Sequence, residues 1–322
     1  MTQIRLVARL EECEALWRSA IPQEVITDLW ETRACFQRHF QRPPLFVVAE
    51  DDRGLAGLLP LSWIEESGCY GYFPGETWHG QTWLEQNRIL ARDAGVLDAM
   101  LQAIPGKYHL RYLNPPAVIP EAQRVVDEIG YIFPAPKYNY DFENYLKEFS
   151  HRSAKRLRRD LEEIESQGAE YTYDVFEDYE HVVRLNISRF GKESYFADDR
   201  FTRGFRDLRD LLAQNGWLRF TTVRLAGQIA AVDMGCVYKN FYTLLAGGTH
   251  NDFPGVAKLI NILHMRRACR ERFEQADFLC GDFCWKTLFH LTPRPLCLIA
   301  NIRLADPHHP DACPSGSATS AQ

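Results

Sequence analysis

Two stretches of this chain of 322 residues repeat each other at a fixed spacing, and that repeat limits the possible folds more than any other feature. Gly54 corresponds to Gly227 and Gly75 to Gly248, and the two pairs have the same separation along the chain. Two glycine pairs can arise by chance, but the predicted elements around them also follow one another in the same order. We therefore predict a duplicated unit of roughly 150 residues, a length typical of one domain. One large mixed sheet with accidental similarity is the alternative.

The repeated order is three strands, a helix and a further strand. Apolar runs bounded by turn residues predict the strands, and apolar positions three and four residues apart predict the helices. The predicted ranges are 45–50, 55–64, 70–73, 86–103 and 108–113 in the first half, and 218–225, 229–238, 241–246, 256–273 and 277–280 in the second. Further helices are predicted near residue 10, over 24–40 and over 121–129.

The domain limits follow from this order. We place an N-terminal domain at 1–145 and a C-terminal domain at 146–304. Residues 305–322 are rich in Pro, Ser, Ala and His and have no periodicity, which predicts a disordered tail. With 46% apolar residues, the chain has enough hydrophobic side chains for each half to bury a core.

Between the halves, residues 150–168 are predicted to form a helix that buries one apolar stripe. Its first turns are basic and its later turns acidic, which is the reverse of what the helix dipole favours. A cluster held against this preference indicates an anionic partner, and the alternative is a solvated face with ion pairs between successive turns. The stripe is Ala154, Leu157, Leu161 and Ile164; the basic residues are Arg152, Lys155, Arg156, Arg158 and Arg159.

The composition excludes several classes of protein. A net charge of −6 gives no overall attraction to nucleic acid or anionic lipid. The start of the chain does not resemble a signal peptide, and the apolar runs are shorter than the ~20 residues that span a bilayer. Nine scattered cysteines without a CxxC pair indicate reduced thiols rather than disulfides or zinc. We therefore expect a cytoplasmic protein with no metal site and no membrane partner.

A glycine-bearing loop that leads into a helix is the first candidate binding site. Such a loop presents unpaired backbone N–H groups at a helix N-terminus, which suits a phosphate or pyrophosphate. An ordinary Pro-Gly turn before a helix is the alternative. The candidate residues are Gly248, Gly255, Val256 and Ala257, with Lys258 as a source of positive charge.

Three motifs follow one another along the chain: Ser153-x-Lys155-Arg156-x-Arg158-Arg159, Pro254-Gly255-x-x-Leu259 and Asp277-Phe278-x-x-Gly281-x-x-x-Trp285-Lys286. In this order they resemble the FemAB-like branch of the GNAT acyltransferase superfamily. The resemblance is clearest over residues 140–300. In addition, Asp252-x-x-Gly255-x-Ala257 is similar to the Gln/Arg-x-x-Gly-x-Gly/Ala loop with which GNAT enzymes bind acyl-CoA, although its first position is acidic here.

This resemblance implies an α+β fold of two tandem GNAT-like domains, each a mixed, mainly antiparallel sheet flanked by helices. It implies acyl-CoA, such as acetyl-CoA, as the co-substrate, an active C-terminal domain and a degenerate N-terminal copy. The acyl group would pass by direct attack in a ternary complex to an amine acceptor, a small molecule or an amino-acid-like compound. The site would lie in the V between the strands predicted at 241–246 and 277–280.

Acyl transfer of this kind needs a base for the amine and benefits from an acid for the leaving thiolate. The candidate bases, in order, are Asp282, His250 and Asp233, and Tyr242 is the candidate acid. Each has an ordinary alternative role, such as a turn cap for Asp282 or structural burial for Asp233. Trp285, Lys286 and Tyr195 are candidates for the acceptor pocket, and core packing or surface ion pairing is the alternative for them.

Three other functions remain open. An aminoacyl-tRNA-dependent transferase of the FemAB type is favoured by the basic helix and disfavoured by the net negative charge. A protein that binds CoA or a nucleotide without catalysis is favoured by Asp252 in the loop. A thiol hydrolase that uses Cys280 or Cys284 with His290 is disfavoured, because a nearby carboxylate raises the pKa of a thiol.

Overall fold

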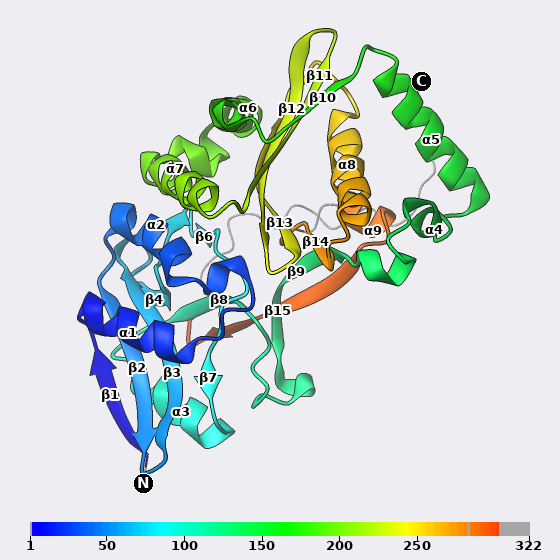
Figure 1. The fold of residues 1–322 in the computed structure, drawn as a ribbon. Helices are drawn as coiled ribbons and strands as arrows, with labels where there is room; N and C mark the ends of the chain where they lie inside the picture. Colours follow the sequence, from blue (N-terminus) through cyan, green and yellow to red (C-terminus); the bar gives the residue numbers. More distant parts are fainter. Residues whose placement is uncertain (1, 282–283, 303–322) are drawn as a thin grey trace.

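The computed structural model describes residues 2–281 and 284–302. Asp282 and the predicted tail at 305–322 lie outside the described residues. In Figure 1 the N-terminal half (blue to cyan) and the C-terminal half (green to orange) are two layered units joined along a common sheet.

The first half is a small antiparallel sheet with helices. Its elements are β1 (Gln3–Val7), α1 (Leu10–Ala20), α2 (Trp30–Phe40), β2 (Pro44–Asp51), β3 (Gly54–Ile64), β4 (Cys69–Tyr72) and α3 (Ala94–Gln102). The strand order is β1-β2-β3-β4, with each neighbouring pair antiparallel. The short strand β7 (Leu90–Ala91) also pairs with β3, and β5 (Thr77–Trp78) forms a hairpin with β6 (Gln81–Thr82).

The second half repeats this order. Its elements are β10 (Glu170–Tyr173), α6 (Tyr179–Phe190), α7 (Asp199–Gln214), β11 (Leu218–Leu225), β12 (Gln228–Tyr238), β13 (Phe241–Thr249), α8 (Val256–Arg270) and β14 (Gln275–Asp277). Helices α6 and α7 lie on one side of this sheet and α8 lies on the other, as Figure 1 shows. Both halves therefore run strand, two helices, three strands, helix, strand, which confirms the predicted duplication.

The last strands of both halves pair with each other in one eight-stranded sheet. The first half ends with β8 (His109–Leu113) and β9 (Val125–Phe133), and the second half ends with β15 (Thr292–Ala300). β9 pairs with β14, whereas β15 runs between β9 and β8. The resulting sheet has the order β10-β11-β12-β13-β14-β9-β15-β8, and in Figure 1 the orange β15 extends toward the N-terminal half. Each half thus depends on a strand of the other.

The predicted helix at 121–129 is wrong, because this segment leads into β9. Its Val and Ile side chains favour a strand, and β15 supplies the pairing that the local pattern does not reveal. The helix predicted at 86–103 begins only at Ala94, where the carboxylate of Asp93 accepts the N–H of Val96 as the N-cap. The helix predicted at 24–40 begins at Trp30, and the sequence pattern does not predict β1.

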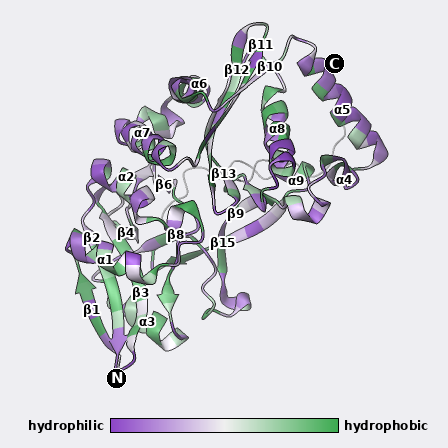
Figure 2. Ribbon diagram, viewed as in Figure 1, coloured by the Kyte–Doolittle hydropathy of each residue, from purple (hydrophilic) through white to green (hydrophobic). Residues whose placement is uncertain are grey.

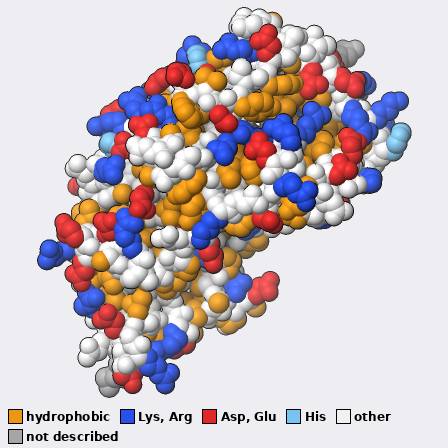
Figure 3. Space-filling model, viewed as in Figure 1, with side chains coloured by type: hydrophobic (Ala, Val, Ile, Leu, Met, Phe, Trp, Pro, Cys, Tyr) orange, Lys and Arg blue, Asp and Glu red, His pale blue; other side chains and the backbone are white. Residues whose placement is uncertain are grey.

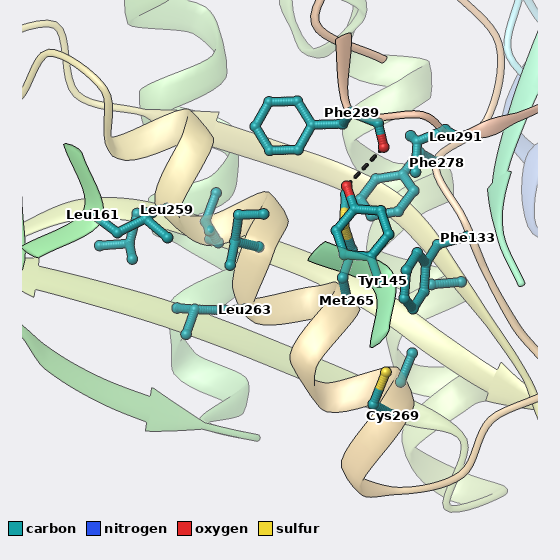
Figure 4. Close-up of a cluster of buried hydrophobic side chains, with 14 of the residues drawn as sticks. Phe133, Tyr145, Leu161, Leu259, Leu263, Met265, Cys269, Phe278, Phe289 and Leu291 are labelled. Atoms are coloured by element: carbon teal, nitrogen blue, oxygen red, sulfur yellow. Dashed lines mark hydrogen bonds between the residues drawn. The ribbon is translucent and has the colours of Figure 1, made fainter. Parts of the chain in front are cut away.

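The linking helix is α5 (His151–Glu165), and its apolar stripe is buried as predicted. The stripe packs beside α8, and in Figure 4 Leu161 of α5 faces Leu259 of α8. In the same cluster the hydroxyl of Tyr145, from α4 (Phe142–Leu146), donates to the carbonyl of Phe289 at 2.7 Å, just after α9 (Cys284–Leu288). Figure 2 shows α5 as mostly hydrophilic. No helix in the described part of the chain is both long and apolar enough to cross a membrane.

Candidate active site

The C-terminal sheet opens between β13 and β14, at the place where the sequence predicts the V. These parallel strands pair at only three positions, Phe241 with Gln275, Tyr242 with Ala276 and Thr243 with Asp277. β13 then continues to Thr249, whereas β14 ends at Asp277. The sheet is therefore split beyond Thr243.

A β-bulge lies at the start of this split. Met234 of β12 pairs with Ala246 and Gly235 pairs with Leu244, so Leu245 is an extra residue on β13. A bulge bends its strand and leaves the extra residue without a partner in the ladder. Backbone groups of β13 are thus freed where the two strands separate.

The loop between β13 and α8 satisfies some of its amides and leaves others open. The amide of His250 donates to the carbonyl of Ala230, that of Val256 to Phe253 and that of Lys258 to Gly255. The amides of Phe253 and Asp252 donate to the carbonyl and to Nδ1 of His250. Within the described residues, the amides of Asn251, Gly255 and Ala257 have no acceptor. Three amides, rather than the whole predicted run, are available to an anion.

Gly248 and Gly255 are required for packing and backbone conformation. A Cβ at Gly248 would lie 2.6 Å from Cβ of Leu185, so the glycine lets α6 approach β13. Gly255 has φ = +86° as the residue before α8, and a Cβ there would lie 2.8 Å from Cδ1 of Ile164. Gly248 is therefore packed against α6.

Two charged side chains near the loop make contacts that the sequence does not predict. Lys258 forms an ion pair with Asp160 of α5 at 2.7 Å, and this pair lowers the pKa of Asp160. The exposed guanidinium of Arg189, at the end of α6, instead reaches the loop, with Nη1 3.3 Å from Oγ1 of Thr249 and 3.5 Å from Oδ1 of Asn251. Sequence reasoning misses Arg189, because α6 and the loop are distant in the chain and nothing local signals their contact.

Two predicted candidates, Asp233 and Tyr242, belong to one buried polar chain. His264 of α8 connects them, with Nε2 2.8 Å from Oδ2 of Asp233 and Nδ1 3.0 Å from the hydroxyl of Tyr242. If Nε2–H donates to the carboxylate, Nδ1 accepts from the tyrosine. All three side chains are buried, and burial, followed by the charge of Asp233, raises the pKa of Tyr242 well above its usual value.

Two glycines make room for this chain and orient it. A Cβ at Gly247 would lie 1.9 Å from Oδ1 of Asp233, and a Cβ at Gly235 would lie 2.6 Å from the hydroxyl of Tyr242. The hydroxyl of Tyr242 therefore lies over β12, on the side away from the β13–β14 split. Sequence reasoning misses His264, although a histidine on the same face as Ile260 and Ala268 of an apolar helix is a detectable signal.

The turn after β14 is held by Lys286, a predicted acceptor-site residue. Its Nζ donates to the carbonyls of Phe278, Leu279 and Cys280 at 3.0, 2.9 and 2.9 Å. The side chain is buried, and burial lowers its pKa. Leu279 has φ = +57°, an unfavourable conformation for a bulky residue that surrounding contacts must maintain. Lys286 thus fixes one arm of the split.

Asp277, the first residue of the signature motif, anchors the same arm. Its carboxylate accepts two bonds from Arg294 of β15, at 2.7 and 3.2 Å, and one from Nε2 of Gln86 at 3.1 Å. It also accepts the amide of Leu279 at 2.9 Å. Trp285 packs edge-on against Phe278, with ring centroids 5.7 Å apart.

A hollow of about 840 Å³ lies between the halves. One wall comes from residues 66–80 of the first half and the other from residues 192–200 of the second. Ser194 of this lining donates to Oδ1 of Asn186 at 2.7 Å, and Nδ2 of Asn186 donates to the carbonyl of Gly247 at 2.8 Å. These bonds connect the wall of the hollow to β13 just beyond its bulge.

The predicted site residues therefore fall into separate groups. Tyr195 follows Ser194 and packs against Trp78 of the first half, at 5.4 Å between ring centroids. His250 is half-buried in the loop, 3.8 Å from the carboxylate of Asp252. Asp282, the first candidate base, is outside the described residues. Among residues 2–281 and 284–302, no three His, Cys, Asp or Glu side chains are arranged to hold a metal ion.

Comparison with known proteins agrees with this geometry. Residues 150–287 match the family model of the acetyltransferase (GNAT) domain. No curated protein matches the chain in sequence. Among solved structures, FemX is similar with a TM-score of 0.55 and 10% identity, over 93% of this chain and 97% of that chain.

Two further solved structures are similar over nearly their whole length. A conserved protein of unknown function from Bacteroides thetaiotaomicron has a TM-score of 0.55 and 13% identity, over 92% of this chain and 99% of that one. A tandem GNAT protein from the clavulanic acid biosynthesis pathway has a TM-score of 0.52 and 10% identity, over 93% and 98%. At these identities the likeness concerns the fold. Residues 150–287 therefore match the acetyltransferase (GNAT) domain, and the chain as a whole shares its fold with FemX and with the tandem GNAT protein.

Proposed function

We propose that the C-terminal half transfers an acyl group from an acyl-CoA to an amine. The observation that carries this proposal is the split between β13 and β14, with the bulge at Leu245 and a helix N-terminus at its mouth. A split of this kind admits an extended thioester between two strands and brings its phosphates to the start of α8. The amides of Asn251, Gly255 and Ala257, together with Arg189, are the groups that would bind the diphosphate.

The hollow between the halves is the proposed acceptor site. It is lined by both signs of charge, with Glu66, Asp198 and Asp199 beside Lys192 and Arg200. Such a lining suits a small acceptor that carries an amine and an acidic group, as an amino acid does. The chain of bonds from Ser194 to Gly247 supports delivery of that amine to β13 beside the bulge.

In the proposed reaction the amine nitrogen attacks the thioester carbonyl while both substrates are bound. The C–N bond forms, the C–S bond breaks, the amine loses a proton and CoA leaves as the thiolate. The protein contributes mainly by holding the two groups in contact, which removes much of the entropic barrier. In this proposal the backbone of β13 at the bulge stabilises the oxyanion.

The N-terminal half is proposed to be a degenerate copy that binds no donor. The connection from β13 to α8 in the second half is short and spans only 250–255. Its counterpart from β4 to α3 spans 73–93 and is several times longer. That connection ends at Asp93, whose carboxylate already accepts the amide of Val96 at the start of α3. The proposed domain limits at 1–145 and 146–304 follow this division of roles.

An aminoacyl-tRNA donor is the second candidate, and α5 favours it. Arg152, Lys155 and Arg156 are exposed and have no ion-pair partner among the described residues. In Figure 3, Lys and Arg side chains crowd the edge where α5 lies, interleaved with acidic ones. Binding of tRNA would weaken steeply as salt is raised, whereas binding of CoA to three amides and one arginine would change little.

The experiment compares Ala257→Glu with Ala257→Gln. Ala257 is exposed in the first turn of α8, where a glutamate suits the helix dipole and preserves the fold. The carboxylate would repel the diphosphate from the open amides, so Ala257→Glu should lose acetyl-CoA affinity by about tenfold or more in a calorimetric titration. Ala257→Gln should retain most of it. Equal affinities in both variants would contradict the proposed site, and binding without thiol release across a panel of amines would favour a non-catalytic protein.

A further inference from the structure

A carboxylate of the N-terminal half reaches into the arm of the split formed by the second half. Glu85 lies on the long β4–α3 connection, and its Oε1 accepts the backbone amide of Cys280 at 2.7 Å. Cys280 lies just after β14, in the opposite half of the sequence from Glu85. The connection that replaces a donor-binding loop in the first half therefore supplies a side chain to the second half.

Several hydrogen bonds hold the turn to which Glu85 is bonded. Lys286 donates to the carbonyls of Phe278, Leu279 and Cys280. Two amides of the same turn donate to carboxylates. The amide of Leu279 meets Asp277, and the amide of Cys280 meets Glu85. Strained residues maintained by many contacts, such as Leu279, are typical of functional sites.

The second oxygen of Glu85 is left unused. Oε2 is buried, yet it has no hydrogen-bond partner among the described residues. A buried acceptor without a partner costs about 1 to 3 kcal/mol, so an unused oxygen in such a well-bonded turn needs an explanation. A donor supplied by a bound substrate would satisfy it.

Burial and neighbouring charges raise the pKa of Glu85 to about 7. Burial raises this pKa most and the charge of Asp277 raises it next, while Arg294 opposes them. The carboxyl can therefore both accept and release a proton near pH 7, as a general base requires. The other titratable or charged groups that interact with Glu85 are Cys280, Lys286 of α9 and Tyr112 of β8.

The split lies next to this group. Leu279 packs against the buried cluster that contains Leu245 of the β13 bulge and Leu84, the residue before Glu85. The turn that binds Glu85 and the bulge of β13 therefore border the same hydrophobic cluster. An amine that enters the split along the arm of β14 would approach the turn to which Glu85 is bonded.

We propose that Oε2 of Glu85 takes the proton that the attacking amine loses. This role rests on the proposed acyl transfer. It assigns the general base to the N-terminal half, whereas the candidate bases predicted from the sequence all lie in the C-terminal half. As the C–N bond forms, the N–H bond breaks and its proton passes to the carboxylate, while the electrons of the C–S bond leave with the thiolate. The protonated Glu85 then returns its proton to solvent or to the thiolate when the products depart.

The test is the pH dependence of transfer in single turnovers, with acetyl-CoA and an aromatic amine that is neutral over the whole range. Such an acceptor contributes no titration of its own, so a rise in rate with a midpoint near pH 7 reports the enzyme base. Glu85→Gln keeps the acceptor for the amide of Cys280 but cannot take a proton. It should lower the rate at high pH by about 100-fold and remove the rise. Glu128→Gln removes a neighbouring carboxylate on β9 and should retain the rise.

The outcomes separate the inference from the function on which it rests. A wild-type protein that transfers with no rise near pH 7, or a Glu85→Gln variant with the wild-type profile, would overturn the role of Glu85 and leave the transferase intact. A wild-type protein that binds acetyl-CoA but acylates no amine would overturn both. Acetyl-CoA affinity is measured in each variant, and it should be unchanged in Glu85→Gln because the donor contacts lie at the other end of the split.

Discussion

The buried carboxyl of Glu85 should make the stability of the protein depend on pH, and this can be measured without any substrate. Burial and Asp277 raise its pKa from 4.5 in the unfolded chain to about 7 in the folded protein. Between these values the folded state binds a proton that the unfolded state has released, so stability falls as pH rises through this window. Below the window the carboxyl is protonated in both states and causes no loss.

The size of the effect follows from the shift. A difference of 7 − 4.5 in pKa, at about 1.4 kcal/mol for each unit, corresponds to about 3 kcal/mol. Glu85→Gln resembles the protonated side chain at every pH and should not lose this stability. The free energy of unfolding of Glu85→Gln minus that of the wild type should therefore grow by about 3 kcal/mol across the window.

Urea unfolding of both proteins, at several pH values from about 4.5 to about 8, measures this difference. Subtraction at each pH cancels the titration of all groups that the two proteins share. Glu128→Gln is the control, since it removes one neighbouring carboxylate but leaves Glu85 in place. A difference between Glu85→Gln and wild type that stays constant with pH would refute the reasoning.

Two further predictions concern the groups that shape the split. Gly247→Ala places a Cβ 1.9 Å from Oδ1 of Asp233, so it should break the bond to His264 and lower the stability to urea by at least about 3 kcal/mol. Gly227→Ala, in an open turn with φ = +74°, should cost only about 1 kcal/mol; equal losses in both variants would contradict the close packing around Asp233. Lys286→Met leaves three carbonyls without their shared donor and should lower stability by about 3 kcal/mol in the same assay, whereas an unchanged midpoint would show that Lys286 does not hold the turn.

The sequence predicts those parts of the fold that depend on local pattern. The paired hairpins around Gly54 and Gly227, and the buried stripe of α5, follow from periodicity and turn residues, and the structure contains both. The exchange of β9 and β15 between the halves cannot be predicted in this way. Pairing between strands that lie so far apart in the chain leaves no local signal, and the pattern at the start of β9 predicts a helix instead.

Contacts between distant parts of the chain also limit how much of the candidate site the sequence predicts. Asp233 and Tyr242 are identifiable because polar residues within apolar strands are conspicuous, but their connection through His264 depends on how α8 crosses the sheet. Sequence reasoning misses Glu85 because the residues that follow it predict a helix, and only the folded chain brings it to Cys280. The ion pair between Lys258 and Asp160 also leaves no local signal, because it forms only when α5 packs beside α8.

The proposed division of labour between the halves rests on one difference in length. The short connection after β13 leaves open amides at the start of α8, and the long connection after β4 carries Glu85 across to the other half. In the proposed function the first half binds no donor and instead forms one wall of the acceptor site. The exchanged strands β9 and β15 keep the two halves in a fixed relation, which a site built from both requires.

A crystal structure of the protein with acetyl-CoA tests the central claim most directly. Our account predicts the diphosphate at the amides of Asn251, Gly255 and Ala257, within reach of Arg189. It also predicts the thioester between β13 and β14, with its carbonyl beside Leu245. A diphosphate bound elsewhere, or a split between these strands that stays filled by side chains while CoA is bound, would contradict it.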